Sequence, residues 1–233
     1  MTLTNGLTSV IYREFPSTQA TAHALSQAVC ESLKAAITQH GQASLALSGG
    51  TTPALFLAEL GQQTVSWSQV HVTLTDERWV PEGDSRANAT LLRRSLLVDK
   101  AQRSRWHALY TDGQTRTQGL ITVNKRLAHF PWPLDVVVLG MGEDGHIASL
   151  FPNGESWTSS PTYPYVIGTH SPSMEERVSL SLDVLTQARH IYLLIHGSAK
   201  AQLLRSAGEL SLPISTLLSR VAAPVTAFMA QEG

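Results

Sequence analysis

The chain has 233 residues, a formal net charge of −1 from 17 Lys and Arg against 18 Asp and Glu, and 42% hydrophobic residues. This length suffices to bury a sizeable core, and the balanced charge, with no basic tract, argues against nucleic acid or an anionic membrane as the main partner. A small anionic ligand, which needs only a few focused cations, is compatible with this composition.

The first half of the chain alternates helical and strand patterns. Ser17 can cap a helix that ends at Gly41, because apolar residues between them recur at helical spacing. The stretch 43–50 then predicts a short buried strand running into a glycine turn, and Pro53 opens a second helix at a position that proline favours. The remaining patterns of this half are a strand over 70–79 and helices over 88–97 and 113–130.

The second half opens with a continuous apolar run at 136–139, which is typical of a parallel strand covered on both faces. The later patterns are strands over 177–182, 190–196 and 225–229, and a helix over 198–207. Strands that alternate with helices predict an α/β fold with a mostly parallel sheet. Because neither an internal repeat nor a convincing linker interrupts the pattern, we expect a single domain over 1–233.

The cysteine content and the first residues of the chain indicate the cellular compartment in which we expect the protein. Cys30 is the single cysteine, so no internal disulfide is expected, and its place in an apolar helical pattern predicts a buried thiol. The stretch 1–15 has no positively charged segment followed by an apolar one, which predicts no secretory signal. No apolar run approaches the ~18 residues of a membrane span. We therefore expect a cytoplasmic protein with no membrane partner.

Three predicted strand ends carry unusual residues: SGGTTP at 48–53, DERW at 76–79 and GMGEDGH at 140–146. In open α/β sheets, ligands gather beyond the carboxyl ends of the strands. The three loops therefore predict one site assembled at that edge.

The glycine turn of the first loop has the features of a phosphate cradle. Gly49 and Gly50 let the backbone approach a ligand closely, and the amides at the helix start present the positive end of the helix dipole. Thr51 adds a hydroxyl donor. The Walker lysine is missing, which argues against an NTPase. A capped tight turn without a ligand is an equal alternative.

Charged residues at other strand ends supply candidate ligand contacts. Two carboxylates and a guanidinium at 76–78 are costly to bury unless they bond one another or a ligand, and the forked guanidinium of Arg78 suits phosphate. Lys200 follows another predicted strand and Arg177 begins one. A structural ion-pair network, or ordinary solvated charges, would explain these residues as well.

The glycines at 140–145 have the spacing of a dinucleotide-binding turn, but the surrounding sequence argues against that function. Pro152 follows too soon for a full helix, and no acidic residue stands about 20 positions on to hold a ribose. The glycines instead predict a loop that projects His146, whose imidazole, with an ordinary pKa of ~6.5, can accept a proton from water. Asp144 is placed to orient the ring or bind substrate, and a structural histidine is the alternative. Because the other histidines show no ligand spacing, we expect neither a nucleotide cofactor nor a metal.

The motifs SGGTTP, DERWVP, LGMGEDGHIASLFP and GSAK, in this order, resemble the 6-phosphogluconolactonase family of the glucosamine/galactosamine-6-phosphate isomerase superfamily over 20–207. The resemblance implies a Rossmann-like open sheet with helices on both faces, shared with the glucosamine-6-phosphate deaminases. It also implies hydrolysis of 6-phospho-D-glucono-1,5-lactone to 6-phospho-D-gluconate in the oxidative pentose phosphate pathway. The implied partner is a small-molecule sugar-phosphate lactone, and the resemblance implies no cofactor and no metal. We expect the protein to be a monomer or a weak homo-oligomer.

The resemblance also implies roles for individual residues. His146 corresponds to the general base that activates water, Asp144 is its neighbour in the catalytic set, and Asp76 matches the proton-moving acid of the deaminases, here expected to be supporting. The implied substrate-binding residues are Gly49, Gly50, Thr51, Arg78, Arg177 and Lys200. Where the family usually has Ser-Asn, this chain has Ala87-Asn88, so any hydroxyl role there is absent.

Two other functions stay open beside the lactonase. The deaminases carry a glutamate where this chain has Phe151, so the relay of a deaminase or aldose–ketose isomerase is incomplete. Lactone hydrolysis needs only an activated water and a polarised carbonyl. A non-catalytic sugar-phosphate-binding regulator of the same fold is the third interpretation, and we expect no helix-turn-helix in the short segment before Ser17.

Overall fold

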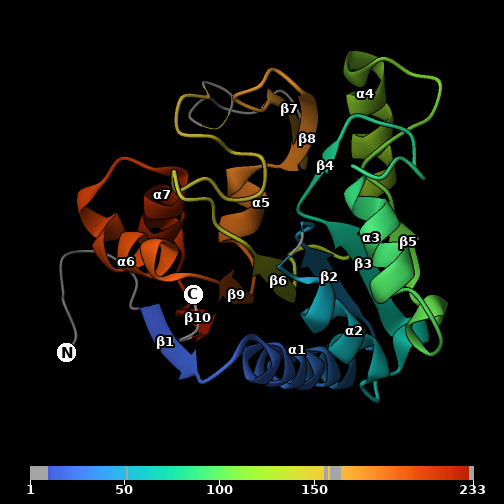
Figure 1. The fold of residues 1–233 in the computed structure, drawn as a ribbon. Helices are drawn as coiled ribbons and strands as arrows, with labels where there is room; N and C mark the ends of the chain where they lie inside the picture. The colour runs from blue at the N-terminus through green and yellow to red at the C-terminus, as the bar shows by residue number, and fades with distance from the viewer. Residues whose placement is uncertain (1–9, 51, 155–156, 158–163, 231–233) are drawn as a thin grey trace.

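The computed structural model describes residues 10–50, 52–154, 157 and 164–230. Its main sheet has the strand order β1-β10-β9-β6-β2-β3-β5, and every neighbouring pair in it is parallel (Figure 1). The strands of this sheet are β1 (Val10–Phe15), β2 (Ala43–Leu47), β3 (Val70–Leu74), β5 (Arg105–His107), β6 (Val136–Leu139), β9 (His190–Ile195) and β10 (Val225–Ala230). The predicted α/β fold with a mostly parallel sheet is confirmed.

A second, smaller sheet forms by antiparallel pairing in the order β4-β8-β7. Its strands are β4 (Asp76–Arg78), β7 (Val166–His170) and β8 (Glu176–Leu180). The predicted single strand over 70–79 is therefore wrong, because the chain changes sheets at Thr75. The Thr75 amide donates to Leu47 of the main sheet at 2.9 Å, while its carbonyl accepts from the Leu180 amide of the small sheet at 2.8 Å.

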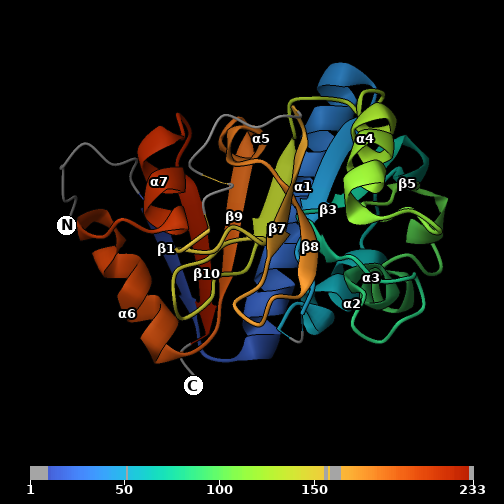
Figure 2. The same cartoon turned by 90° about the horizontal axis from the view of Figure 1, so that it is seen from above.

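Helices lie on both faces of the main sheet. They are α1 (Thr18–His40), α2 (Ala54–Gln62), α3 (Asn88–Ser95), α4 (Arg116–Leu127), α5 (Leu182–Thr186), α6 (Ser198–Ser206) and α7 (Pro213–Arg220). α1 packs along one face against β2, β6, β9 and β10, and α5 and the β7-β8 hairpin lie over the other face (Figures 1 and 2). The predicted ends of α1 are confirmed: the Ser17 hydroxyl accepts from the Ala20 amide at 3.2 Å, and Gly41 ends the helix at φ 74°.

Several elements lacked a readable signal in the sequence. β1 is an edge strand whose four central residues are exposed, so it shows no apolar pattern. β5 has 3 residues and α5 has 5, which is too short for a period to appear. β7 and α7 were likewise not expected, and the other elements begin and end within a few residues of the predicted ranges.

The sheet order places the candidate loops together. β2, β6 and β9 are neighbours and parallel, so the segments that follow them leave the sheet at the same edge. β3 pairs with β2 in parallel, so the chain also leaves β3 at this edge. β4 of the small sheet follows directly and therefore places the DERW motif there. Among the helices of the described residues, none is long and apolar enough to cross a bilayer.

Candidate active site

A cleft of about 250 Å³ opens at this edge and gathers residues from all the predicted loops. Of the residues expected to bind substrate or take part in chemistry, it is lined by Gly49, Gly50, Asp76, Arg78, His146, Arg177 and Lys200. Asp144 lies beside His146 at the cleft margin. Thr51 lies outside the described residues, so its hydroxyl role stays a prediction.

The first glycine turn is built around Asn88. A Cβ on Gly49 would lie 2.0 Å from the Asn88 side-chain oxygen, so no larger residue fits there while Asn88 keeps its place. Asn88 in turn donates its side-chain amide to the Asp76 carbonyl at 2.9 Å. Gly50 has a φ of 102°, a conformation that favours glycine. The turn is thus locked to the start of α3 and to β4.

The glycine loop after β6 presents His146. The His146 Nδ1 lies 2.6 Å from Asp144 Oδ1, and the same carboxylate oxygen accepts from the His146 backbone amide at 3.2 Å. A Cβ on Gly142 would lie 2.2 Å from that Nδ1 and 2.5 Å from that oxygen, so glycine makes room for the pair. With Nδ1–H donated to Asp144, Nε2 is the nitrogen left to accept a proton.

The geometry of this loop also differs from a dinucleotide-binding turn. Residues 146–154 form turns and isolated bridges rather than a helix, with Ile147 bridged to both Met141 and Leu150. The His146 ring packs on Phe151, with centroids 4.8 Å apart. The backbone therefore offers no helix start to receive a pyrophosphate.

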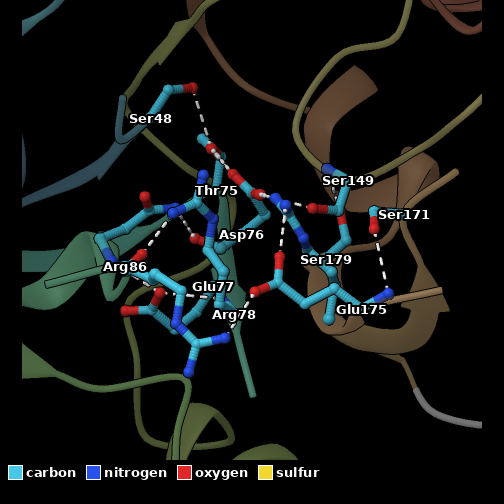
Figure 3. Close-up of polar contacts among 12 residues, drawn as sticks. Ser48, Thr75, Asp76, Glu77, Arg78, Arg86, Ser149, Ser171, Glu175 and Ser179 are labelled. Atoms are coloured by element: carbon cyan, nitrogen blue, oxygen red, sulfur yellow. Dashed lines mark hydrogen bonds and ion pairs between the residues drawn. The ribbon is translucent and has the colours of Figure 1, made fainter. Parts of the chain in front are cut away.

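Asp76 is buried, at 6% exposure, and both of its carboxylate oxygens are engaged (Figure 3). Oδ1 accepts from the Thr75 hydroxyl at 3.2 Å, and Oδ2 accepts from the Ser149 hydroxyl at 2.5 Å. The Arg177 guanidinium lies 3.9 Å from Oδ2. Asp76 therefore serves as a fixed acceptor that joins β4 to the His146 loop. The sequence did not single out Ser149, because a lone serine in a hydrophobic stretch carries no signal.

Glu77 points away from the cleft and caps α3. Its carboxylate accepts from the amides of Arg78, Asn88 and Ala89 at 2.7 to 2.8 Å. Ala87 stands at the N-cap and has no side-chain hydrogen bond to offer, so Glu77 satisfies donors that an N-cap hydroxyl would otherwise take. Burial raises the pKa of Glu77 to about 7, against the lowering effect of the three amide hydrogen bonds.

Arg78 and Arg177 form the positive wall of the cleft. They are direct partners in the antiparallel pairing of β4 with β8. Arg78 also donates to the Arg86 carbonyl, and Arg177 donates to Glu175 at 2.7 Å. The Nε atoms of both guanidinium groups are buried and have no hydrogen-bond partner among the described residues. The strand pairing thus places two guanidinium groups beside each other at the wall of the cleft.

Lys200 completes the cations of the cleft from the first turn of α6, at the end of β9. His196, which sequence reasoning left aside, also lines the cleft, and its Nδ1 lies 3.4 Å from the Thr18 hydroxyl at the start of α1. In the described part of the chain no cluster of three or more His, Cys, Asp or Glu side chains could hold a metal ion.

The His146–Asp144 pair and the cations of the cleft lie together at the carboxyl edge of a parallel α/β sheet, where α/β enzymes bind their ligands. The chain belongs to the family described as glucosamine-6-phosphate isomerases/6-phosphogluconolactonase, whose model matches residues 16–227. The family expected from the motifs is thereby confirmed.

Individual relatives cover nearly the whole chain. A 6-phosphogluconolactonase from Rhizobium meliloti is 39% identical over 224 residues, covering 93% of this chain and 97% of its own. One from Pseudomonas aeruginosa is 37% identical and covers 88% of each chain. The crystal structure of a 6-phosphogluconolactonase from Shewanella baltica superposes with a TM-score of 0.90 at 31% identity, covering 95% of this chain and 98% of that one.

Proposed function

We propose that the chain hydrolyses 6-phospho-D-glucono-1,5-lactone to 6-phospho-D-gluconate. The observation that carries this proposal is the His146–Asp144 pair at 2.6 Å, because His146 lines the cleft together with Arg78 and Arg177. The relatives at 32–39% identity named 6-phosphogluconolactonase support it. The place of the reaction in the oxidative pentose phosphate pathway and a cytoplasmic location belong to the same proposal.

His146 supplies the base. Its Nε2 takes a proton from a water molecule while the water oxygen attacks C1 of the lactone, and the carbonyl oxygen becomes an oxyanion. Collapse of the tetrahedral intermediate breaks the bond between C1 and the ring oxygen, which receives the proton back from the imidazolium. Asp144 holds the ring through Nδ1 and stabilises the imidazolium that forms between the two steps. The reaction needs no covalent nucleophile.

Phosphate anchoring falls to the cations and the glycine turn. The backbone at Gly49 and Gly50 approaches the cleft without side chains, and Arg78 and Lys200 bring positive charge to it. Thr51 is assigned to the same group on the resemblance of its motif. Arg177 lies next to Arg78 and binds substrate oxygens in this account. Fixing the phosphate orients C1 toward His146, and such positioning is itself a large part of catalysis.

Asp76 acts in support of the site. Its two oxygens accept from Thr75 and Ser149, which hold the carboxylate in place beside the cleft. The second candidate function is a deaminase or aldose–ketose isomerase, whose relay would need Asp76 to move protons. Phe151 also packs on His146 where that relay would need a carboxylate. A non-catalytic sugar-phosphate-binding regulator is the third candidate.

A direct assay separates the three candidates. Freshly made 6-phosphogluconolactone is added to the protein, and 6-phosphogluconate is followed with a coupled dehydrogenase against the spontaneous rate. The proposal predicts hydrolysis well above that rate, with glucosamine 6-phosphate and fructose 6-phosphate left unchanged. Deamination or isomerisation of those sugars would select the second candidate. Tight binding of 6-phosphogluconate with no rate above background would select the regulator.

A further inference from the structure

The loop that carries His146 is fastened to β4 by one short buried hydrogen bond. The Ser149 hydroxyl donates to Asp76 Oδ2 at 2.5 Å, and Ser149 is fully buried. Ser149 stands three residues after His146, beyond the glycines that give the loop its turn. This bond therefore joins the loop that bears the proposed base to the strand that bears Arg78.

Asp76 is a rigid partner for that bond. Its other oxygen accepts from Thr75, whose hydroxyl lies 2.9 Å from the Ser48 hydroxyl. The Ser48 hydroxyl lies 3.1 Å from the Val138 carbonyl. These polar contacts run from the ends of β6 and β2 through Thr75 and Asp76 to the His146 loop (Figure 3). Because the chain passes from the main sheet to the small sheet between Thr75 and Asp76, Ser149 is tied to the junction of the two sheets.

The backbone beside Ser149 needs such a restraint. Ala148 has a φ of 49°, in the left-handed region that residues with a Cβ rarely adopt. Backbone of this kind persists only where the surrounding structure holds it. Ile147 and Leu150 are fully buried and fix the loop from one side, and the Ser149 hydroxyl fixes it from the other. The Ser149 amide also donates to the Ser179 hydroxyl of β8 at 3.3 Å, so without the Ser149 hydroxyl the segment keeps its tie to β8 but loses its tie to Asp76.

We infer that Ser149 is a positioning residue for the reaction, which sets the place of His146 by holding its loop against Asp76. The inference rests on the proposed function. The phosphate contacts proposed for Gly49 and Lys200 lie on other elements, and Arg78 stands on β4, whose pairing with β8 does not involve the Ser149 hydroxyl, so we expect loss of this hydroxyl to leave them in place. Ser149→Ala therefore lowers kcat about 10- to 100-fold, the scale of a misplaced catalytic group, while the Kd for 6-phosphogluconate changes little.

The other end of the sheet offers a matched control. The Ser44 hydroxyl donates to the buried carboxylate of Asp135 at 3.1 Å, and Ser44 is fully buried like Ser149. Ser44 is the second residue of β2 and Asp135 precedes β6, so this pair lies at the amino ends of the strands, away from the cleft. Ser44→Ala removes the same kind of hydrogen bond and lowers the unfolding temperature, but leaves kcat at the wild-type value.

The experiment measures kcat, KM, the Kd of 6-phosphogluconate and the unfolding temperature for the wild type, Ser149→Ala, Ser149→Cys and Ser44→Ala. Of the two alanine variants, we expect a lower kcat in Ser149→Ala and an unchanged kcat in Ser44→Ala. The kcat of Ser149→Cys should lie between those of the wild type and Ser149→Ala, because a thiol is a weaker donor than a hydroxyl. If Ser149→Ala does not fold, Ser149→Cys takes its place in the test. Its kcat should then lie below the kcat of Ser44→Ala.

The possible failures are distinguishable. A wild-type protein that does not hydrolyse the lactone overturns the proposed function, and this inference with it. An active wild type with equal kcat in Ser149→Ala and Ser44→Ala overturns the inference alone. The same holds if KM and the Kd of 6-phosphogluconate rise as much as kcat falls, because the hydroxyl would then support the whole cleft rather than His146.

Discussion

Arg78 and Arg177 stand directly opposite each other in the antiparallel pairing of β4 with β8. Like charges in this position destabilise a sheet, and here both Nε atoms are buried without a partner among the described residues. Glu175 and Asp76 offset part of the charge of Arg177, whereas the Arg78 side chain, within the described part of the chain, donates to the Arg86 carbonyl and forms no ion pair. The pairing therefore concentrates positive charge at the wall of the cleft, where we propose that the anionic substrate binds.

Arg78→Met tests whether the Arg78 guanidinium binds the anionic ligand. We expect binding of 6-phosphogluconate to weaken about 10- to 150-fold, since a charge-assisted hydrogen bond contributes roughly 1.5–3 kcal/mol. The unfolding temperature without ligand should change little, because the variant also removes repulsion from Arg177. Calorimetric titration and thermal unfolding, with and without inorganic phosphate, measure both effects. An unchanged Kd would show that Arg78 is not a ligand contact.

Gly142 and Gly140 allow a matched test of the His146 loop. A Cβ on Gly142 would collide with the His146–Asp144 pair, whereas a Cβ on Gly140 would meet nothing within 4 Å. Gly142→Ala should therefore lower kcat about 100-fold or more, because the imidazole must move. Gly140→Ala leaves the His146–Asp144 pair in place and should therefore lower kcat much less. Equal activity in the two variants would mean that the loop absorbs the methyl group without displacing His146.

Substitutions of Glu77 and Ala87 should have coupled effects on the free energy of unfolding. Glu77→Ala leaves the amides at the start of α3 without their acceptor and should lower the free energy of unfolding by about 1–3 kcal/mol. Ala87→Ser then supplies an N-cap hydroxyl and should recover about 1 kcal/mol in that background. In the wild type, where Glu77 already holds the amides, the serine should add less. Urea unfolding of the four proteins measures the coupling, and strictly additive effects would contradict it.

Glu77 should also shape the pH dependence of stability. Burial raises its pKa in the folded chain to about 7 from the ordinary 4.5, so between these values the folded chain holds more protons than the unfolded one. The contribution of Glu77 therefore makes stability fall as pH rises from about 4.5 to about 7. Glu77→Gln removes this titration. Urea unfolding at several pH values should give a smaller decline across that window for the variant, and parallel curves would contradict the raised pKa.

Much of the site was readable in the sequence because parallel strands bring their carboxyl ends to one edge. The loops after β2 and β6 and the cation after β9 could therefore be placed together without knowing any distance. The glycines at 140–145 were also correctly interpreted as a loop around His146, since Pro152 and the missing acid argued against a dinucleotide turn.

What could not be predicted depends on contacts between distant segments. The change of sheets at Thr75 leaves no mark in an apolar run, and the opposition of Arg78 and Arg177 follows from the register of β4 with β8. Glu77 was expected in a charged cluster with its neighbours, but it bonds the amides of a helix that begins eleven residues later. The contact between Ser149 and Asp76 joins segments 73 residues apart, so the sequence gives no sign of it.

The central claim is that the glycine loop presents His146 as the base that activates water. The most direct test is His146→Ala, with kcat for 6-phosphogluconolactone and the Kd of 6-phosphogluconate measured on the same folded sample. Since positioned general-base catalysis contributes about 10²–10⁴-fold, the account predicts a fall in kcat of that size with the Kd and the unfolding temperature nearly unchanged. A near-normal kcat, accompanied by a clear loss of thermal stability, would contradict it and make His146 a structural residue.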